Sequence, residues 1–149
     1  MTSSWDLYCT AVVRFQLDAA VVELTPAAPG TCAGVLPPAA AVHVITAFNP
    51  GGRTAARDVN ARAQAALVAE IDALGLRWWP AAGGDFAAGH VEDSVAVAGL
   101  DDRAARALGH RYGQDAVFAW TPGAWRLLSC RDTRTATFGW VARTHSAAA

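Results

Sequence analysis

The stretch Ile45-Thr46-Ala47-Phe48-Asn49-Pro50-Gly51-Gly52-Arg53 connects a strand pattern to a long helix pattern. Pro50 fixes its own φ and disfavours a helical conformation at Asn49, whereas Gly51 and Gly52 allow a sharp backbone turn. Arg53 adds a permanent positive charge where the helix begins. A loop of this kind presents amide groups beside a helix start, so we expect it to border a binding site.

Two helix patterns and several short strand patterns surround this loop. The apolar stripe Val59, Ala63, Leu67, Ile71 and Leu74 predicts a helix over residues 54–74 that stops at Gly75, and a second helix over 101–112 begins at a capping aspartate. Residues 5–17 fit a helix or a strand and slightly favour a helix, whereas the Pro- and Gly-rich residues 27–40 predict a loop. Strands are predicted at residues 21–25, 41–48, 76–80, 91–98, 116–120 and 125–130.

This order of elements predicts an α+β fold. Two main helices would pack on one face of a largely antiparallel sheet of about six strands, as a two-layer sandwich. Residues 1–130 would form one domain, which a chain of 149 residues is long enough to fill with a core. Residues 131–149 would form a C-terminal tail, either a further strand or an arm that docks on a second subunit.

Composition excludes several functions. The net charge of −1 gives no broad attraction to nucleic acid, and all twelve basic residues are Arg, which excludes Schiff-base and P-loop lysine chemistry. No membrane-length apolar run occurs, and three widely spaced cysteines favour reduced thiols over disulfides or a zinc site. We therefore expect a cytoplasmic protein with no membrane partner, no nucleic-acid partner, no metal and no cofactor.

Alternation along residues 90–98 separates two faces of one strand. Val91, Asp93, Val95 and Val97 suit the helix-covered face, which leaves His90, Glu92 and Ser94 together on the opposite face. Trp78 or Trp79, Trp120 and Arg126 would join them from neighbouring strands. This second face of the sheet is therefore a candidate binding or interface surface.

The middle of the chain resembles a bacterial family called domain of unknown function 3293, over about residues 41–130. The resemblance rests on Ile45 to Pro50, Asn60, Gly83, His90-Val91-Glu92-Asp93-Ser94 and Tyr112-Gly113-Gln114-Asp115-Ala116-Val117-Phe118. Members usually carry a larger aromatic residue where this chain has Phe48. No activity carries over from the family, but the resemblance implies that Asn49, Asn60, Glu92 and Gln114 belong to one polar cluster.

Each of these residues has a structural interpretation as well as a functional one. Asn49 fits an Asx turn or a ligand contact, whereas Asn60 and Gln114 fit loop support better than catalysis. Glu92 would either form an ion pair with Arg53 or act as a general base. Either interpretation of Glu92 places it near Arg53, so we expect these side chains to converge on one concave site.

Three functions remain open. The preferred one is binding of a small molecule or peptide beside the Asn-Pro-Gly-Gly-Arg loop; the ligand residues would be Asn49, Arg53, Asn60, Trp78, Ser94 and Gln114. An alternative is an enzyme acting on an anionic, phosphodiester-like substrate, with Glu92 as base, His90 as acid and Arg53 as charge clamp. The third is a protein–protein interaction module, including a homo-oligomer formed through the tail or the aromatic sheet face.

Overall fold

The computed structural model describes residues 4–18 and 20–145, which form three α-helices, one 3-10 helix and nine strands. The helices are α1 (Ser4–Thr10), α2 (Arg57–Ala73) and α3 (Asp102–Arg111), with the 3-10 helix η1 at Pro50–Gly52. The strands are β1 (Val12–Leu17), β2 (Ala20–Ala27), β3 (Cys32–Gly34), β4 (Val42–Thr46), β5 (Trp78–Asp85), β6 (His90–Ala98), β7 (Ala116–Thr121), β8 (Ala124–Ser129) and β9 (Thr135–Thr144).

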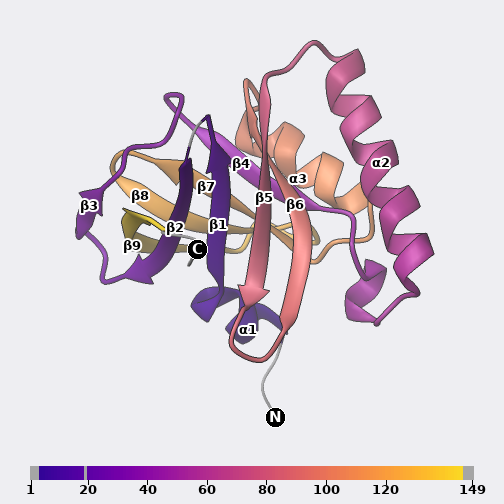
Figure 1. The fold of residues 1–149 in the computed structure, drawn as a ribbon, viewed down its shortest axis with the longest axis horizontal. Helices are drawn as coiled ribbons and strands as arrows, with labels where there is room; N and C mark the ends of the chain where they lie inside the picture. The colour runs from indigo at the N-terminus through magenta and orange to yellow at the C-terminus, as the bar shows by residue number, and fades with distance from the viewer. Residues whose placement is uncertain (1–3, 19, 146–149) are drawn as a thin grey trace.

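The strands form a closed barrel (Figure 1). Their order is β2-β1-β5-β6-β4-β7-β8-β9-β3, and an additional antiparallel pairing between β2 and β9 joins the two sides of the sheet. Eight antiparallel strands thus form the barrel, while β3 pairs in parallel with β9 outside it. Closure pairs the backbone groups that two exposed edge strands would leave open.

The predicted two-layer sandwich of about six strands is therefore wrong. Two segments bring the six predicted strands to the eight of the barrel. Residues 5–17, for which a helix was favoured over a strand, contain the short helix α1 and then β1. The tail, expected as a further strand or a docking arm, contains β9, which pairs with both β8 and β2. The predicted loop at residues 27–40 contains the short strand β3 outside the barrel. The helical spacing of Trp5 and Tyr8 is real but ends at Thr10.

Aromatic side chains fill the barrel interior. The rings of Phe118 and Trp125 stack with centroids 4.7 Å apart, and those of Phe15 and Trp120 lie 4.8 Å apart. Trp120, Trp125 and Trp140 are fully buried. The interior is thus a packed core, and Trp79 and Trp120, expected on an open sheet face, lie inside it, whereas Trp78 packs on the outer side under the helices.

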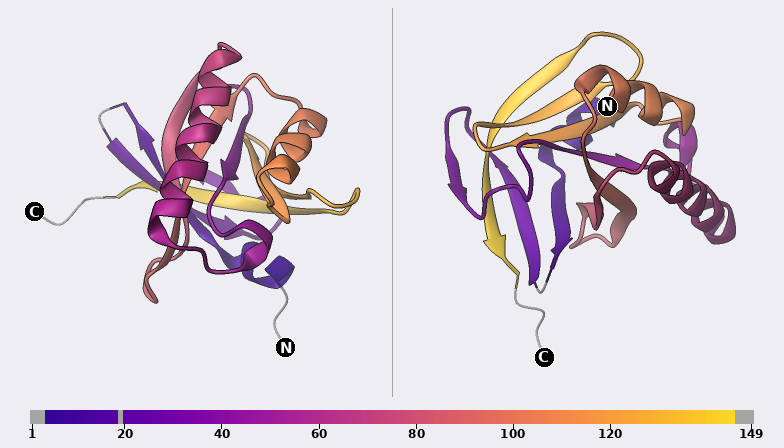
Figure 2. Two further views of the ribbon diagram at one scale, coloured as in Figure 1. Left: turned by 90° about the vertical axis from the view of Figure 1, so that its right-hand side faces the viewer. Right: turned by 90° about the horizontal axis from the view of Figure 1, so that it is seen from above.

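Both longer helices lie outside the barrel on the same side (Figure 2), and α1 lies at one end (Figure 1). Leu67 and Ile71 of α2 and Leu108 of α3 pack on outward-facing residues of the barrel wall such as Ile45 and Val95. No helix among residues 4–18 and 20–145 is long and apolar enough to cross a membrane.

The helix boundaries confirm one detail of the sequence analysis and correct another. Helix α3 begins after Asp101, whose carboxylate accepts a 2.7 Å hydrogen bond from the Ala104 amide, as a capping aspartate should. Helix α2 begins at Arg57 rather than at residue 54. At the two ends of its predicted stripe, Val59 is 42% and Leu74 59% exposed, because only its middle touches the barrel.

Candidate functional site

The loop after β4 is held in place by an asparagine pair. Asn49 has a left-handed backbone conformation (φ 50°, ψ 59°), which asparagine tolerates better than most residues. Its amide N–H donates to Asn60 Oδ1 at 2.8 Å, and Asn60 Nδ2 donates to Asn49 Oδ1 at 2.9 Å. The Ala55 amide donates to the same Oδ1 at 3.0 Å. Asn60, which is buried in α2, thus fixes the conformation of the loop.

The C-terminal end of α3 holds the other side of this loop. Gln114 Nε2 donates to the carbonyl of Phe48 at 3.0 Å and to that of Tyr112 at 3.2 Å. The Gly51 amide donates to the Gly113 carbonyl at 2.7 Å. Gly113 has a φ of +72°, and a side chain there would meet Pro50, with its Cβ only 2.7 Å from the Pro50 Cβ. The loop and the end of α3 therefore pack as one unit.

Glu92 completes this group. Asn49 Nδ2 donates to Glu92 Oε1 at 3.1 Å. We call the three residues Asn49, Asn60 and Glu92 the Asn49 cluster. Burial raises the pKa of Glu92, and the Asn49 hydrogen bond partly opposes that shift. Glu92 forms no ion pair within residues 4–18 and 20–145. Its carboxylate is thus half-buried and not neutralised by any cation of the described chain.

Glu92 lies on the barrel-interior face of β6. Glu92 pairs with Gly83, and Ser94, two residues further along β6, pairs with Ala81. Ala81 and Ala96 belong to the interior core. Because alternate residues of a strand share a face, Glu92 lies on the same face as Ser94 and Ala96. Burial raises the pKa of Tyr8 in α1, and the negative charge of Glu92 adds to that shift. The sheet face of Glu92 and Ser94, expected to be open, is therefore the inner face of the barrel. Helix α1 lies beside the end of the barrel that contains Glu92.

Among the described residues, the side chains of the remaining candidates form no hydrogen bond with the side chains of the Asn49 cluster. Ser94 is buried and its hydroxyl donates to the Glu92 carbonyl at 3.2 Å, within β6. His90 is exposed at the start of β6, and Arg53 is exposed with no hydrogen bond or ion pair to any described residue. Trp78 Nε1 donates to Asp72 Oδ1 at 2.8 Å, which ties β5 to α2.

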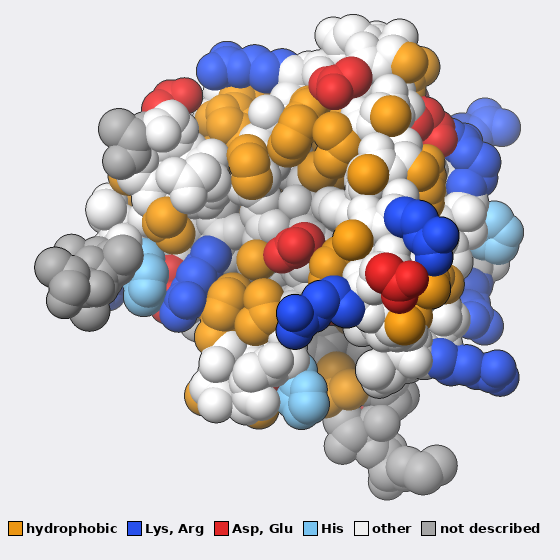
Figure 3. Space-filling view, turned by 45° about the vertical axis from the view of Figure 1, so that its right-hand side comes forward, with side chains coloured by type: hydrophobic (Ala, Val, Ile, Leu, Met, Phe, Trp, Pro, Cys, Tyr) orange, Lys and Arg blue, Asp and Glu red, His pale blue; other side chains and the backbone are white. Residues whose placement is uncertain are grey.

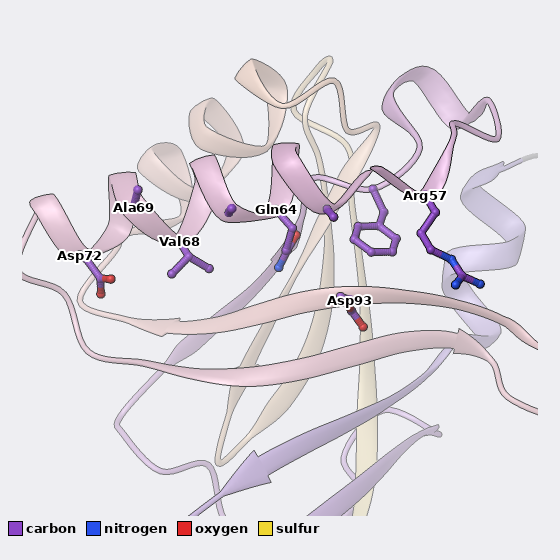
Figure 4. Close-up of a pocket in the computed structure, with 9 residues that line it drawn as sticks. Arg57, Gln64, Val68, Ala69, Asp72 and Asp93 are labelled. Atoms are coloured by element: carbon purple, nitrogen blue, oxygen red, sulfur yellow. The ribbon is translucent and has the colours of Figure 1, made fainter. Parts of the chain in front are cut away.

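A groove runs between α2 and the outer face of β6, beside the same loop (Figure 4). It measures about 520 Å³. Figure 3 shows hydrophobic side chains along the hollowed face where α2 lies, with acidic and basic side chains beside them. The residues that line this α2–β6 groove are Phe48, Arg57, Ala61, Gln64, Ala65, Val68, Ala69, Asp72 and Asp93.

The charged groups of the groove are Arg57, Asp72 and Asp93. Asp72 accepts the Trp78 hydrogen bond, whereas the side chains of Arg57 and Asp93 form no ion pair with any residue of the described ranges. Gln64 points from α2 toward β6 (Figure 4), and its Oε1 accepts from the Ala47 amide at 3.1 Å. The groove thus combines an apolar floor with two unneutralised charges of opposite sign.

Sequence reasoning did not single out Arg57, Gln64 or Asp93 as site residues. A signal was present for Asp93, because it is the one charged residue among the helix-facing valines of its strand. Glu92 and Asp93 are neighbours in the chain but lie on opposite faces of β6. Glu92 and the groove are consequently separate features on either side of one strand.

A second polar cluster that sequence reasoning missed joins α3 to the barrel. His43 Nε2 lies 2.8 Å from Asp102 Oδ1, and Arg126 donates to both oxygens of Asp102 at 2.7 and 3.1 Å. The hydrogen bonds from Arg126 are the main cause that lowers the pKa of Asp102 to about 2. Since His43 is buried and Asp102 begins α3, we interpret this cluster as an anchor for the helix.

The comparisons with known proteins identify a family. No curated protein and no solved structure matches the chain. The family model described as "Protein of unknown function (DUF3293)" matches residues 45–117, from β4 to the start of β7. That segment contains the whole Asn49 cluster, together with Gln114 and every residue that lines the α2–β6 groove. The resemblance noted in the sequence is confirmed, because residues 45–117 match the family described as Protein of unknown function (DUF3293).

Proposed function

We propose that the protein binds a small molecule or a short peptide in the α2–β6 groove. One observation carries this proposal: Arg57 and Asp93 border an apolar groove without neutralising each other or pairing with another described residue. The volume of about 520 Å³ lies within the range of roughly 300–1,000 Å³ that small-molecule sites occupy.

The lining defines the chemistry of the ligand. A positively charged group would pair with Asp93 and a negatively charged group with Arg57, while an apolar body would lie on Ala65, Val68 and Ala69. Gln64 adds an amide that hydrogen-bonds in either direction. A free amino acid or a short peptide has this combination of charges and apolar surface.

The Asn49 cluster supports binding by making the groove rigid. Phe48 and Arg57 flank the loop that Asn60 and Gln114 hold with hydrogen bonds on its two sides. A lining that is already ordered loses less conformational entropy when a ligand binds. In this proposal Asn49 and Asn60 position the edge of the groove and do not touch the ligand.

Chemical-shift mapping with a panel of free amino acids and dipeptides tests the proposal. A binding member should shift the amide signals of Gln64, Val68 and Asp93 in a saturable way. Ala65→Trp should abolish these shifts by filling the groove, whereas Ala66→Trp, at an exposed position of α2 outside the groove, should leave them intact. Shifts elsewhere in the protein, or shifts that persist in the Ala65 variant, would refute the proposal.

Acid–base catalysis by Glu92 is a second candidate, favoured by the burial that raises its pKa. No hydrogen bond joins Glu92 to His90 within the described parts of the chain, so the acid of the expected pair has no structural support. A bis-aryl phosphodiester assay separates the two functions. Turnover that is lost in Glu92→Gln and retained in Ala65→Trp would favour the enzyme over the groove.

A further inference from the structure

We infer a second binding site, for a small oxyanion such as a phosphate or carboxylate group, between α3 and the end of β8. A groove of about 460 Å³ lies between this helix and the end of β8. We call it the α3–β8 groove. Its lining residues are Arg106, Ala107, His110, Arg111, Ser129, Cys130, Arg131 and Asp132. None of these residues belongs to the Asn49 cluster or to the α2–β6 groove.

The positive charges of this groove differ in how far they are neutralised. Arg111 pairs with Glu70, and Arg131 pairs with Asp115 at 2.7 Å. Arg106 donates from Nη2 to the neutral hydroxyl of Thr135 at 2.7 Å and forms no ion pair with any described residue. Arg106 is thus the one arginine of the lining that forms no ion pair with a described residue.

Arg106 also carries an unsatisfied donor. Its Nε–H is buried and has no hydrogen-bond partner among the described residues. Buried donors are rarely left without an acceptor, because they lose their hydrogen bonds to water. The guanidinium fork presents several N–H groups in a geometry that matches an oxyanion. An oxyanion in the groove would neutralise Arg106 and accept hydrogen bonds from this fork.

Two neighbouring groups set the strength of this site. Asp132 is the carboxylate of the lining, and hydrogen bonds from the Arg134 amide and the Ser129 side chain lower its pKa, so that it opposes an incoming anion. Burial raises the pKa of the Cys130 thiol to about 11. Cys130 is therefore uncharged at neutral pH and adds no repulsion.

The experiment follows the side-chain Nε–H signal of Arg106 in ¹⁵N-labelled protein at constant ionic strength. Inorganic phosphate and acetate are titrated in turn, with chloride as the reference salt. We expect a saturable shift of this signal and of the Arg131 and Asp132 amides with at least one of the two oxyanions. A shift with phosphate alone would assign the site to phosphate groups, and a shift with acetate alone to carboxylates.

Three variants make the test specific. Arg106→Gln should weaken binding, read from the Arg131 and Asp132 amides, at least tenfold. Arg103→Gln removes an exposed charge of the same helix outside the groove and should leave the affinity within twofold. Asp132→Asn should tighten binding severalfold. The inference is overturned if chloride produces the same shifts, if no shift saturates, or if the Arg103 and Arg106 variants weaken binding equally.

Discussion

Replacing Asn60 with alanine should lower the free energy of unfolding by about 2–4 kcal/mol. Asn60 is 6% exposed and makes two hydrogen bonds with Asn49, at 2.8 and 2.9 Å. Each such bond contributes about 0.5–1.5 kcal/mol net, and a buried donor that loses its partner costs a further 1–3 kcal/mol or so. The better helix propensity of alanine offsets about 0.5 kcal/mol of this loss.

Urea denaturation of the wild type and the variant measures this difference. A double-mutant cycle with Asn49→Gly isolates the pair, because glycine accepts the left-handed conformation of residue 49 without its side chain. The coupling free energy between the two substitutions should exceed about 1 kcal/mol. Gln64→Ala, which removes the single 3.1 Å bond to the Ala47 amide, is the matched control and should cost about 0.5–1.5 kcal/mol.

Two results would refute this reasoning. One is a loss below about 0.5 kcal/mol in Asn60→Ala, which would mean that water replaces both hydrogen bonds at no cost. The other is strict additivity of the Asn49 and Asn60 substitutions, which would mean that the two side chains do not act together.

Three further substitutions probe other parts of the structure. Glu92→Gln keeps the acceptor for Asn49 and should change the free energy of unfolding at pH 7 by less than about 1.5 kcal/mol; a loss of roughly 3 kcal/mol or more would indicate a cationic partner. Because the pKa of Glu92 is raised in the folded state, wild-type stability should fall as pH rises from the unfolded toward the folded pKa, and urea midpoints should show no such fall in the variant. Asp102→Asn should lower the free energy of unfolding at pH 6 but hardly at pH 2. The lowered pKa of Asp102 stabilises the fold at pH values above the pKa of this group in the unfolded chain, and that stabilisation is lost as the pH falls toward about 2. An equal loss at both pH values would contradict this. Gly109→Ala would place a Cβ 2.6 Å from Val117 Cγ1 and 2.7 Å from Cys130 Sγ, so thermal unfolding should show a loss of about 1–3 kcal/mol instead of the usual helix-propensity gain.

Local patterns in the sequence predicted the elements that depend on neighbouring residues. The helix that begins after Asp101 and ends before Gly113 was predicted within one residue at each end. The alternation of residues 91–98 was also correct, because Val95 and Val97 pack under the helices while Ala96 faces the opposite side. Periodicity reports which side of an element is apolar. Periodicity does not show what covers the opposite side of a strand. In β6 that side faces the barrel interior.

Candidate site residues were predicted unevenly for a similar reason. The family resemblance pointed to Asn49, Asn60 and Glu92, which the structure brings into hydrogen-bond contact. The expected partner of Glu92 was Arg53, and the structure shows no ion pair between them. Charge complementarity indicates which side chains could form an ion pair, but the path of the backbone determines which of them meet.

The sequence by itself determined the loop at residues 49–53, the extent of the last helix and the two faces of β6, since each depends on backbone preferences and side-chain spacing over a few residues. Only the tertiary structure decided the closed barrel, because closure pairs β2 with β9, more than a hundred residues apart in the chain. The α2–β6 groove likewise exists because a helix and a strand that are distant in sequence lie side by side. Contacts of this range are selected by the free energy of burying the whole core, which no short segment encodes.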